Sequence, residues 1–260
     1  MVRVIGRDHA RLAYDALADA YDVVTAGADH ERWCAEIERL AIEAGMSGRR
    51  VLDVACGKGA SFRPFLERGY AVTACDISPR MAAEAADPRA EVHVLDMRDL
   101  PALGEHDLAV CLNDAVNCLL EPGELEATLR GIARNLAPGG VLVFDANTVR
   151  TARDVFGGLF VWPEPERVVV WRGDPASRDA AEGDRVTAEV EILRRGEDGW
   201  RRDVSVHVQR HHPERTVRRA LAAAGLRLVR VGGMPEGVAV RDELDELADL
   251  KALYVARLGP

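Results

Sequence analysis

The sequence has no uninterrupted run of the roughly 18 apolar residues that a membrane helix needs. Its first residues, MVRVIGRDHARLAYDALADAYD, carry charges throughout and lack an apolar core followed by a small-residue cleavage site, so they do not resemble a signal peptide. We therefore expect a cytoplasmic protein with no membrane partner.

A net positive charge is also absent, because 43 acidic residues outnumber 34 basic ones, which gives a net charge of -9 and an isoelectric point of about 5.4. This balance argues against nucleic acid as a partner, since phosphate binding needs a basic surface. Only two lysines occur, Lys58 and Lys251, and we attribute this bias to base composition rather than to function. None of the five cysteines forms a C-x-x-C pair, so we expect neither a disulfide framework nor a zinc site.

What the sequence does contain is an alternation of strand and helix patterns. The segments VLDVACG, AVTACD, VHVLDM, HDLAVCLND and VLVFDAN read as strands, and each ends at a polar residue or a glycine. Helical patterns separate them, including EPGELEATLRGIARNLAPGG, which we expect to end in a sharp turn. The alternation predicts an α/β fold with a doubly wound parallel sheet.

The flanking regions follow other patterns. Residues 8 to about 45 show helical periodicity, whereas roughly 160 to 212 contain three longer alternating strands with turn residues between them, typical of an antiparallel insertion. The chain then returns to helix and strand, and we expect the acidic stretch RDELDELADL to form a solvated face or a short helix.

The loop after the first strand contains Gly57 and Gly59 but has Phe62 where a dinucleotide fingerprint requires a third glycine. The same loop is not a P-loop, because four residues would have to separate a first glycine from the Gly-Lys-Ser/Thr sequence, and they do not. It predicts a nucleotide ligand but disfavours NAD, NADP and a triphosphate.

Polar residues follow at the ends of the next strands, where open α/β sheets bind ligands. Asp76 closes the second strand, where its carboxylate can accept hydrogen bonds from both ribose hydroxyls. Asp96 and Met97 close the third and offer a polar acceptor and a soft apolar side chain to an adenine ring. Asn113 and Asp114 close the fourth, beside the expected position of a reacting group.

Taken in order, VLDVACGKG, CDIS, LDMRDLP and LAPGGVLVFD resemble the motifs of class I S-adenosylmethionine-dependent methyltransferases over about residues 50 to 148. The resemblance implies a seven-stranded Rossmann-like sheet with S-adenosylmethionine as cofactor and S-adenosylhomocysteine as product. Ala55 stands where the family more commonly has glycine, at little cost if the backbone there is still strand. The residues that the resemblance assigns to the cofactor are Tyr21, Asp53, Ala55, Gly57, Gly59, Asp76, Ile77, Asp96, Met97 and Asn113.

The N-terminal tyrosines, the Asp-x-Asn-Thr ending of the fifth strand and the β insertion are similar to those of glycine and aminosugar N-methyltransferases. This likeness implies four parts, namely a helical lid (1–46), a cofactor-binding core (47–150), an insertion on the acceptor side (151–212) and a segment that completes the sheet (213–260). It favours methyl transfer to a small-molecule amine. The alternatives are an O-methyltransferase of a phenolic or carboxyl natural product, a non-catalytic cofactor-binding regulator and a nicotinamide oxidoreductase.

The acceptor side carries several candidate catalytic residues. His207 and His211 share one face of VSVHVQRHH, and valines occupy the other face. If the valine face packs on the core, the histidines face solvent or line an acceptor pocket. In an acceptor pocket, either histidine can act as a general base. Asp114 and Tyr14 complete the catalytic set. Carboxylate and amide oxygens at the ends of the fourth and fifth strands suggest a magnesium site as a minor alternative, formed by Asp114, Asp145 and Asn147, although we expect no metal. We instead expect Asp114 and Asn117 to make polar contacts to the acceptor. An exposed edge of the insertion allows a homodimer.

Overall fold

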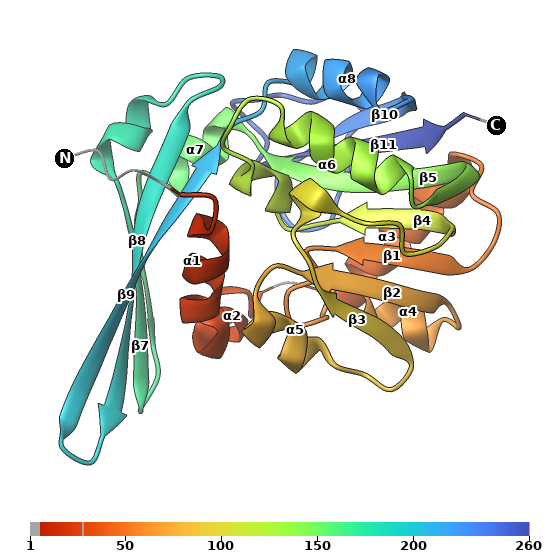
Figure 1. Ribbon diagram of the computed structural model, residues 1–260. Helices are drawn as coiled ribbons and strands as arrows, with labels where there is room; N and C mark the ends of the chain where they lie inside the picture. Colours follow the sequence, from red (N-terminus) through yellow and green to blue (C-terminus); the bar gives the residue numbers. More distant parts are fainter. Residues whose placement is uncertain (1–5, 28, 260) are drawn as a thin grey trace.

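The computed structural model describes residues 6–27 and 29–259, so residues 1–5 of the expected lid lie outside it. Two β-sheets lie side by side, as Figure 1 shows. The larger is a seven-stranded sheet with the order β10-β11-β5-β4-β1-β2-β3, in which only β11 runs antiparallel to its neighbours. This confirms the predicted fold. Its strands are β1 (Arg50–Val54), β2 (Ala71–Asp76), β3 (Ala90–Val94), β4 (His106–Cys111), β5 (Leu136–Asn147), β10 (Leu226–Met234) and β11 (Lys251–Leu258).

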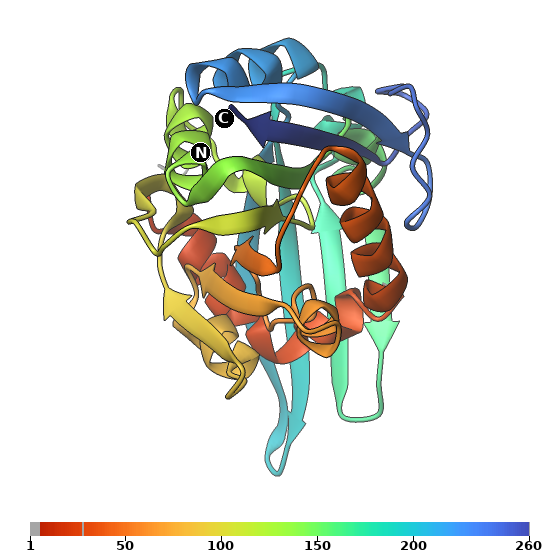
Figure 2. The ribbon, with the colours of Figure 1, turned by 90° about the vertical axis from the view of Figure 1, so that its right-hand side faces the viewer.

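Helices cover both faces of this sheet, which is why its central strands are apolar at consecutive positions (Figure 2). Val51 of β1 packs on the face covered by α3, and Leu52 packs on the face covered by α6 and α8. The helices around this sheet are α3 (His30–Glu43), α4 (Arg63–Glu67), α5 (Pro79–Ala85), α6 (Glu124–Ala133) and α8 (Glu214–Ala223).

The second sheet is antiparallel, with the order β6-β7-β8-β9. The sequence predicted three of its strands and missed β6, a short edge strand that ends at a proline. Its strands are β6 (Leu159–Pro163), β7 (Arg167–Gly173), β8 (Arg185–Gly196) and β9 (Gly199–Arg210), preceded by α7 (Val149–Asp154).

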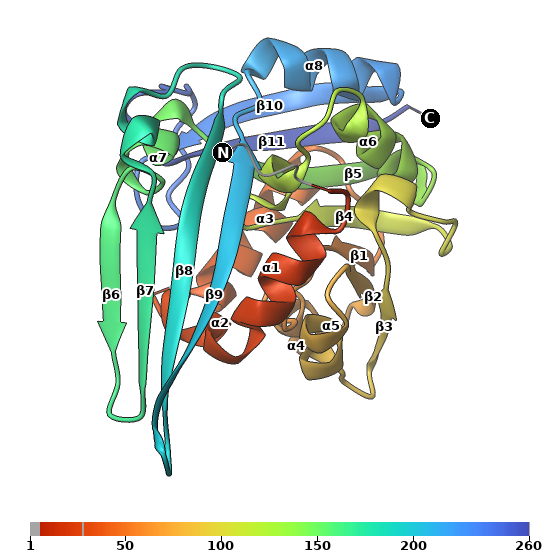
Figure 3. The same ribbon diagram turned by 60° about the vertical axis from the view of Figure 1, so that its left-hand side comes forward.

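The N-terminal segment packs between the two sheets, as Figure 3 shows. It forms α1 (His9–Leu17), a 3-10 turn η1 (Ala18–Ala20) and α2 (Tyr21–Val24). Leu17 and Ala20 bury their side chains against Val169 and Val190 of the second sheet. On the other side, Lys58 Nζ binds Asp22 Oδ2 of α2 at 2.7 Å. The lid is therefore attached to both sheets.

One expectation about local structure was wrong, and a second is confirmed only in part, because the acidic stretch is largely exposed except at one residue. The LAPGG segment forms the first residues of the long strand β5 instead of a turn, because Leu136 already pairs with His106 of β4. The acidic stretch forms no helix, and its Asp249 is fully buried, where it accepts hydrogen bonds from Arg241 and from the Asp245 amide. Its carboxylates therefore stabilise the fold as well as facing solvent.

The remaining elements are three short 3-10 helices, and among the described residues no helix is long and apolar enough to cross a membrane. They are η2 (Met97–Asp99), η3 (Ala115–Cys118) and η4 (Pro175–Asp179).

Candidate functional site

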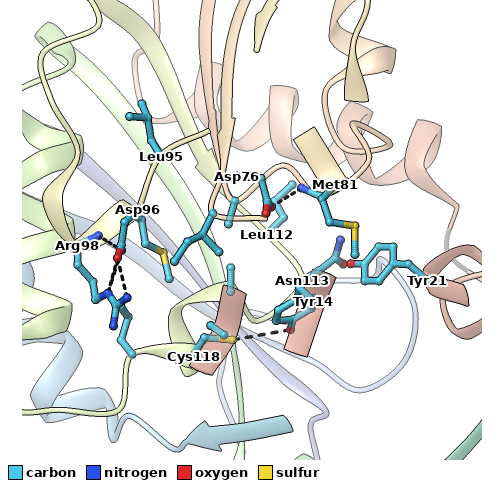
Figure 4. A pocket seen from close by; sticks show the side chains of 17 residues that line it. Tyr14, Tyr21, Asp76, Met81, Leu95, Asp96, Arg98, Leu112, Asn113 and Cys118 are labelled. Atoms are coloured by element: carbon cyan, nitrogen blue, oxygen red, sulfur yellow. Dashed lines mark hydrogen bonds and ion pairs between the residues drawn. The ribbon is translucent and has the colours of Figure 1, made fainter. Parts of the chain in front are cut away.

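A first cavity lies at the carboxyl ends of the parallel strands, where the glycine loop and the two loops after β2 and β3 meet. In Figure 4, Tyr14, Tyr21 and Asn113 gather on one side of it, and Asp96 and Arg98 lie on the other. Of the residues assigned to the cofactor, those that line this cavity are Tyr21, Ala55, Gly57, Asp76, Ile77, Asp96, Met97 and Asn113.

Asp76 connects the glycine loop to the second strand. Its Oδ2 accepts a hydrogen bond from the Gly57 amide at 2.9 Å, and its Oδ1 accepts one from the Ser78 amide at 2.8 Å. Burial raises the pKa of this carboxyl, and the backbone hydrogen bonds partly oppose the increase. Each carboxylate oxygen keeps a further lone pair, so Asp76 can still accept bonds from a ribose diol.

The third glycine is unnecessary because Phe62 fills the space beneath the loop. Its side chain is fully buried, and a Cβ added at Gly59 would lie 2.7 Å from its ring. Gly59, with φ of +83°, therefore shapes the loop from behind and does not line the cavity. By contrast, a Cβ added at Gly57 would meet, within the described part of the chain, only the ring of Tyr21, at 3.8 Å.

The backbone at Ala55 was predicted wrongly. β1 ends at Val54, and Ala55 adopts φ of +61°, in the left-handed region that disfavours every residue with a Cβ. The glycine that the family more commonly has here would relieve this strain.

Asp53 lies just behind the cavity and not in its lining. Its side chain is buried, with Oδ2 accepting a hydrogen bond from the Ser61 hydroxyl. Burial raises the pKa of Asp53 to about 7, the Ser61 bond lowers it and the nearby Asp76 charge raises it further. Its Oδ1 has no hydrogen-bond partner among the described residues, as fits a carboxylate whose partner belongs to a ligand.

The far end of the cavity is apolar except for one ion pair. Both oxygens of Asp96 already accept hydrogen bonds from Arg98, including one of 2.6 Å from Nη2. Asp96 therefore has less capacity for an adenine amino group than the sequence suggested. The flat apolar surface comes from Ile77, Met81, Leu95, Met97, Leu112 and Leu119.

A second cavity, of about 430 Å³, opens from the first toward the antiparallel sheet. Tyr14, Tyr21 and Asn113 line both cavities, so the two meet at these residues. Its outer wall is aromatic: Phe160 and Trp162 stack with ring centroids 6.1 Å apart. Further large apolar side chains that line this cavity are Leu17, Val24, Val155, Phe156, Trp171, Val208 and Leu250.

Asp114 supplies the acidic group of the second cavity. It is held in a left-handed conformation with φ of +56°, and Gln209 Nε2 donates to its Oδ2 at 2.6 Å. Lys251 Nζ binds Asp114 Oδ1 at 2.8 Å and Asp145 Oδ2 at 2.6 Å. The lysine ammonium thus lies between the carboxylates of the suggested magnesium site, which argues against a metal there.

Of the two predicted histidines, one lines the second cavity and the other does not. His207 lines the second cavity, where burial lowers its pKa to about 4, so it is a weak base at neutral pH. His211 is buried beside Glu246, 3.0 Å from Nε2 to Oε2, and lines neither cavity. Val204 is 41% exposed whereas Val208 is 5% exposed, so the valine face of β9 is covered only toward the end of the strand, where His207 and Gln209 are buried as well.

Sequence reasoning assigned no role to Lys251 or to the aromatic wall, and it placed Asn117 against the acceptor. Asn117 is instead buried, where it donates to the Arg210 carbonyl and accepts from the Asn147 amide. The signal in the sequence that could have pointed to Lys251 was the rarity of lysine. Lys58 binds Asp22 of the lid, and Lys251 lines the second cavity. Attributing the two lysines to base composition overlooked this.

Known proteins share both the sequence pattern and the fold. A family model described as a methyltransferase domain matches residues 51–140. A dTDP-3-amino-3,6-dideoxy-alpha-D-glucopyranose N,N-dimethyltransferase from Streptomyces fradiae is 32% identical over 85% of this chain and 88% of its own length. The chain belongs to the S-adenosylmethionine-dependent methyltransferases.

Two solved methyltransferases extend the likeness to the whole fold. A sugar N-methyltransferase from Streptoalloteichus matches with a TM-score of 0.74 and 25% identity over 93% of each chain. An amino pentose methyltransferase from Micromonospora echinaspora, solved with S-adenosylmethionine bound, matches with a TM-score of 0.70 and 26% identity over 92% of this chain and 94% of its own. The protein is therefore an enzyme that uses S-adenosylmethionine as methyl donor and acts on a small-molecule acceptor.

Proposed function

We propose that this methyltransferase methylates an amine of a small molecule, with amino sugars as the first acceptor class to test. The observation that carries the proposal is the Asp114 carboxylate, which lines the acceptor cavity next to the residues shared with the cofactor cavity. A carboxylate at this point attracts a protonated amine and stabilises the positive charge that nitrogen acquires when it receives the methyl group.

The reaction itself asks little of the protein beyond alignment. The acceptor first loses a proton to solvent, and its nitrogen lone pair then forms a bond to the methyl carbon while the carbon–sulfur electron pair stays on sulfur. The positive charge moves from the donor's sulfonium to the acceptor nitrogen. Holding the two reactants in line can supply about 7–11 kcal/mol of the barrier reduction. Tyr14 and Tyr21, between the cavities, are proposed to exclude water from this line.

For the cofactor we assign the ribose to Asp76, the adenine to the surface around Met97, and the methionine ammonium to Asp53, which lies just behind the cavity lining. The hydrogen bonds at Asp76 and the unpartnered Oδ1 of Asp53 support these assignments. The relatives described above as aminosugar and sugar N-methyltransferases support the amine. A hydroxyl acceptor needs a base, and His207, with its pKa near 4, is a weak one.

The proposal is tested with pairs of acceptors that differ in one group. Purified protein is incubated with S-adenosylmethionine and either an amino sugar or the same sugar with hydroxyl in place of the amine, both free and nucleotide-linked. We expect methylation of the amine alone, located by mass-spectrometric fragmentation. Preferential methylation of the hydroxyl partner, or of phenols added to the panel, would refute it.

We also propose that the second sheet mediates a homodimer. Leu159 and Val161 of the edge strand β6 are 59% and 52% exposed, an apolar surface suited to a second copy. Light scattering should give twice the mass of one chain, and a monomer at micromolar concentration would contradict the proposal.

A further inference from the structure

Asp145 lies close to the acceptor cavity without being part of its lining. It is 1% exposed at the end of β5, its Oδ2 binds Lys251 Nζ at 2.6 Å, and its Oδ1 accepts a 3.2 Å hydrogen bond from the Asp114 amide. Lys251, from β11, lines the acceptor cavity and holds Asp114 as well. Two carboxylates from neighbouring strands thus share one ammonium.

The other titratable groups around Asp114 are neutral near pH 7. The pKa values of Tyr14 and Tyr21 lie above their ordinary range, mainly through the neighbouring Cys118 for Tyr14 and through burial for Tyr21. Burial also raises the pKa of Cys118 to about 12 and lowers those of His9 and His207. On the other side of Lys251 and Asp145, a further cavity is lined by Asp29, Arg32 and His30; the first two carry opposite charges, and burial lowers the pKa of His30. Apart from these groups and Asp76 across the cofactor cavity, the charges around the acceptor side of Asp114 are its own and those of Lys251 and Asp145.

The sum of these three charges matters for an amine acceptor. If Lys251 neutralised Asp114 alone, the pair would attract an ammonium only weakly. Without Lys251, the carboxylates would bind the ammonium tightly and keep its proton in place. One ammonium between two carboxylates leaves a single net negative charge, which attracts the amine but still allows it to lose a proton.

We propose that Asp145 is a positioning residue that acts through Lys251 to set the pH at which the bound amine loses its proton. The inference rests on the proposed amine acceptor and goes beyond it, because it assigns a role to Asp145 and Lys251, neither of which is among the residues assigned to the cofactor.

The main test is the pH dependence of kcat for an amine that the native enzyme methylates. Asp145→Asn removes one negative charge, so Lys251 acts on Asp114 alone and the bound ammonium becomes a stronger acid. We expect the acid limb of the kcat profile to move down by about one pH unit and the acceptor KM to rise severalfold. An unmoved limb overturns the proposal.

A second substitution separates charge from structural damage. Lys251→Gln combined with Asp145→Asn removes one charge of each sign, so the limb should return toward its native position, whereas structural damage would accumulate. Lys251→Arg keeps the charge and should leave the limb in place. Lys58→Gln, at the only other lysine, should change the KM for S-adenosylmethionine without moving the limb. A double variant displaced further than Asp145→Asn contradicts the proposal.

The two lysines also allow a measurement on the native protein, which does not depend on how the variants fold. Protein labelled with nitrogen-15 at lysine Nζ should give two side-chain NMR signals, assigned with Lys58→Gln. Adding the amine acceptor to the complex with S-adenosylhomocysteine should shift the Lys251 signal and leave the Lys58 signal in place. An unchanged Lys251 signal overturns the inference, whereas a native enzyme that methylates no amine refutes the proposed function itself.

Discussion

The cofactor cavity and the acceptor cavity are built in different ways. Apart from three lid residues, the lining of the first comes from residues 55 to 119, mostly at the ends of neighbouring parallel strands. The second draws on residues from His9 to Lys251 and on both sheets. The first cavity is thus lined mainly by one continuous segment, whereas the second, which we propose as the acceptor site, is lined by side chains that only the complete fold brings together.

The largest effect that would sharpen this comparison is expected at Asp76. Asp76→Ala removes the acceptor of the Gly57 and Ser78 amides and the proposed ribose contact. Hydrogen bonds to charged groups contribute about 1.5–3 kcal/mol each, so affinity for S-adenosylhomocysteine should fall about 100-fold. Titration calorimetry measures it, with Asp114→Asn as the variant that should bind normally. A change of less than about threefold would show that the loop binds its ligand without this carboxylate.

The next effect belongs to the acceptor cavity. Asp114→Asn removes the charge that faces the proposed amine but keeps an oxygen for Lys251, so kcat/KM for the acceptor should fall about 10- to 100-fold. Affinity for S-adenosylhomocysteine should stay within the error of calorimetry. An equal loss of acceptor kcat/KM and of S-adenosylhomocysteine affinity would mean that the two cavities do not bind their ligands independently.

His207 predicts a smaller effect, on stability at acid pH. Its folded-state pKa of about 4 is below the unfolded value of 6.5, so its contribution is fully present above pH 6.5 and is lost as the pH falls toward 4. At pH 5 the loss amounts to about 2 kcal/mol. In urea unfolding at pH 7.5 and pH 5, His207→Gln should lose less stability than the native protein. Equal losses would mean that the ring is already charged.

The smallest effect is expected at Ala55. Ala55→Gly relieves the left-handed strain at φ of +61°, which is offset partly by the greater freedom of glycine in the unfolded chain. We expect a stabilisation of about 0.5 kcal/mol, read from the urea midpoint, with Ala83→Gly in helix α5 as a destabilising control. Destabilisation by Ala55→Gly would show that Ala55 is not strained.

The comparison also explains where sequence reasoning worked. The strands and their polar ends were identified because each motif is local and the apolar runs are short, rich in β-branched residues and bounded by glycine or polar residues. The errors were of two kinds. Ala55 and the LAPGG segment depend on backbone details at strand boundaries. The position of His211 outside both cavities and the exposure of Val204 depend on which side chains the rest of the fold covers, and alternation alone does not specify this.

The sequence alone determined that the chain has a parallel sheet with a nucleotide site at one edge. The carboxyl ends of parallel strands meet at the same edge, so residues next to each strand end converge whatever the rest of the chain does. Only the tertiary structure decided that Lys251 lies between Asp114 and Asp145 and that the N-terminal helices and the second sheet line one cavity. Lys251 is 137 residues from Asp114, and the antiparallel pairing of β11 with β5 brings the two together.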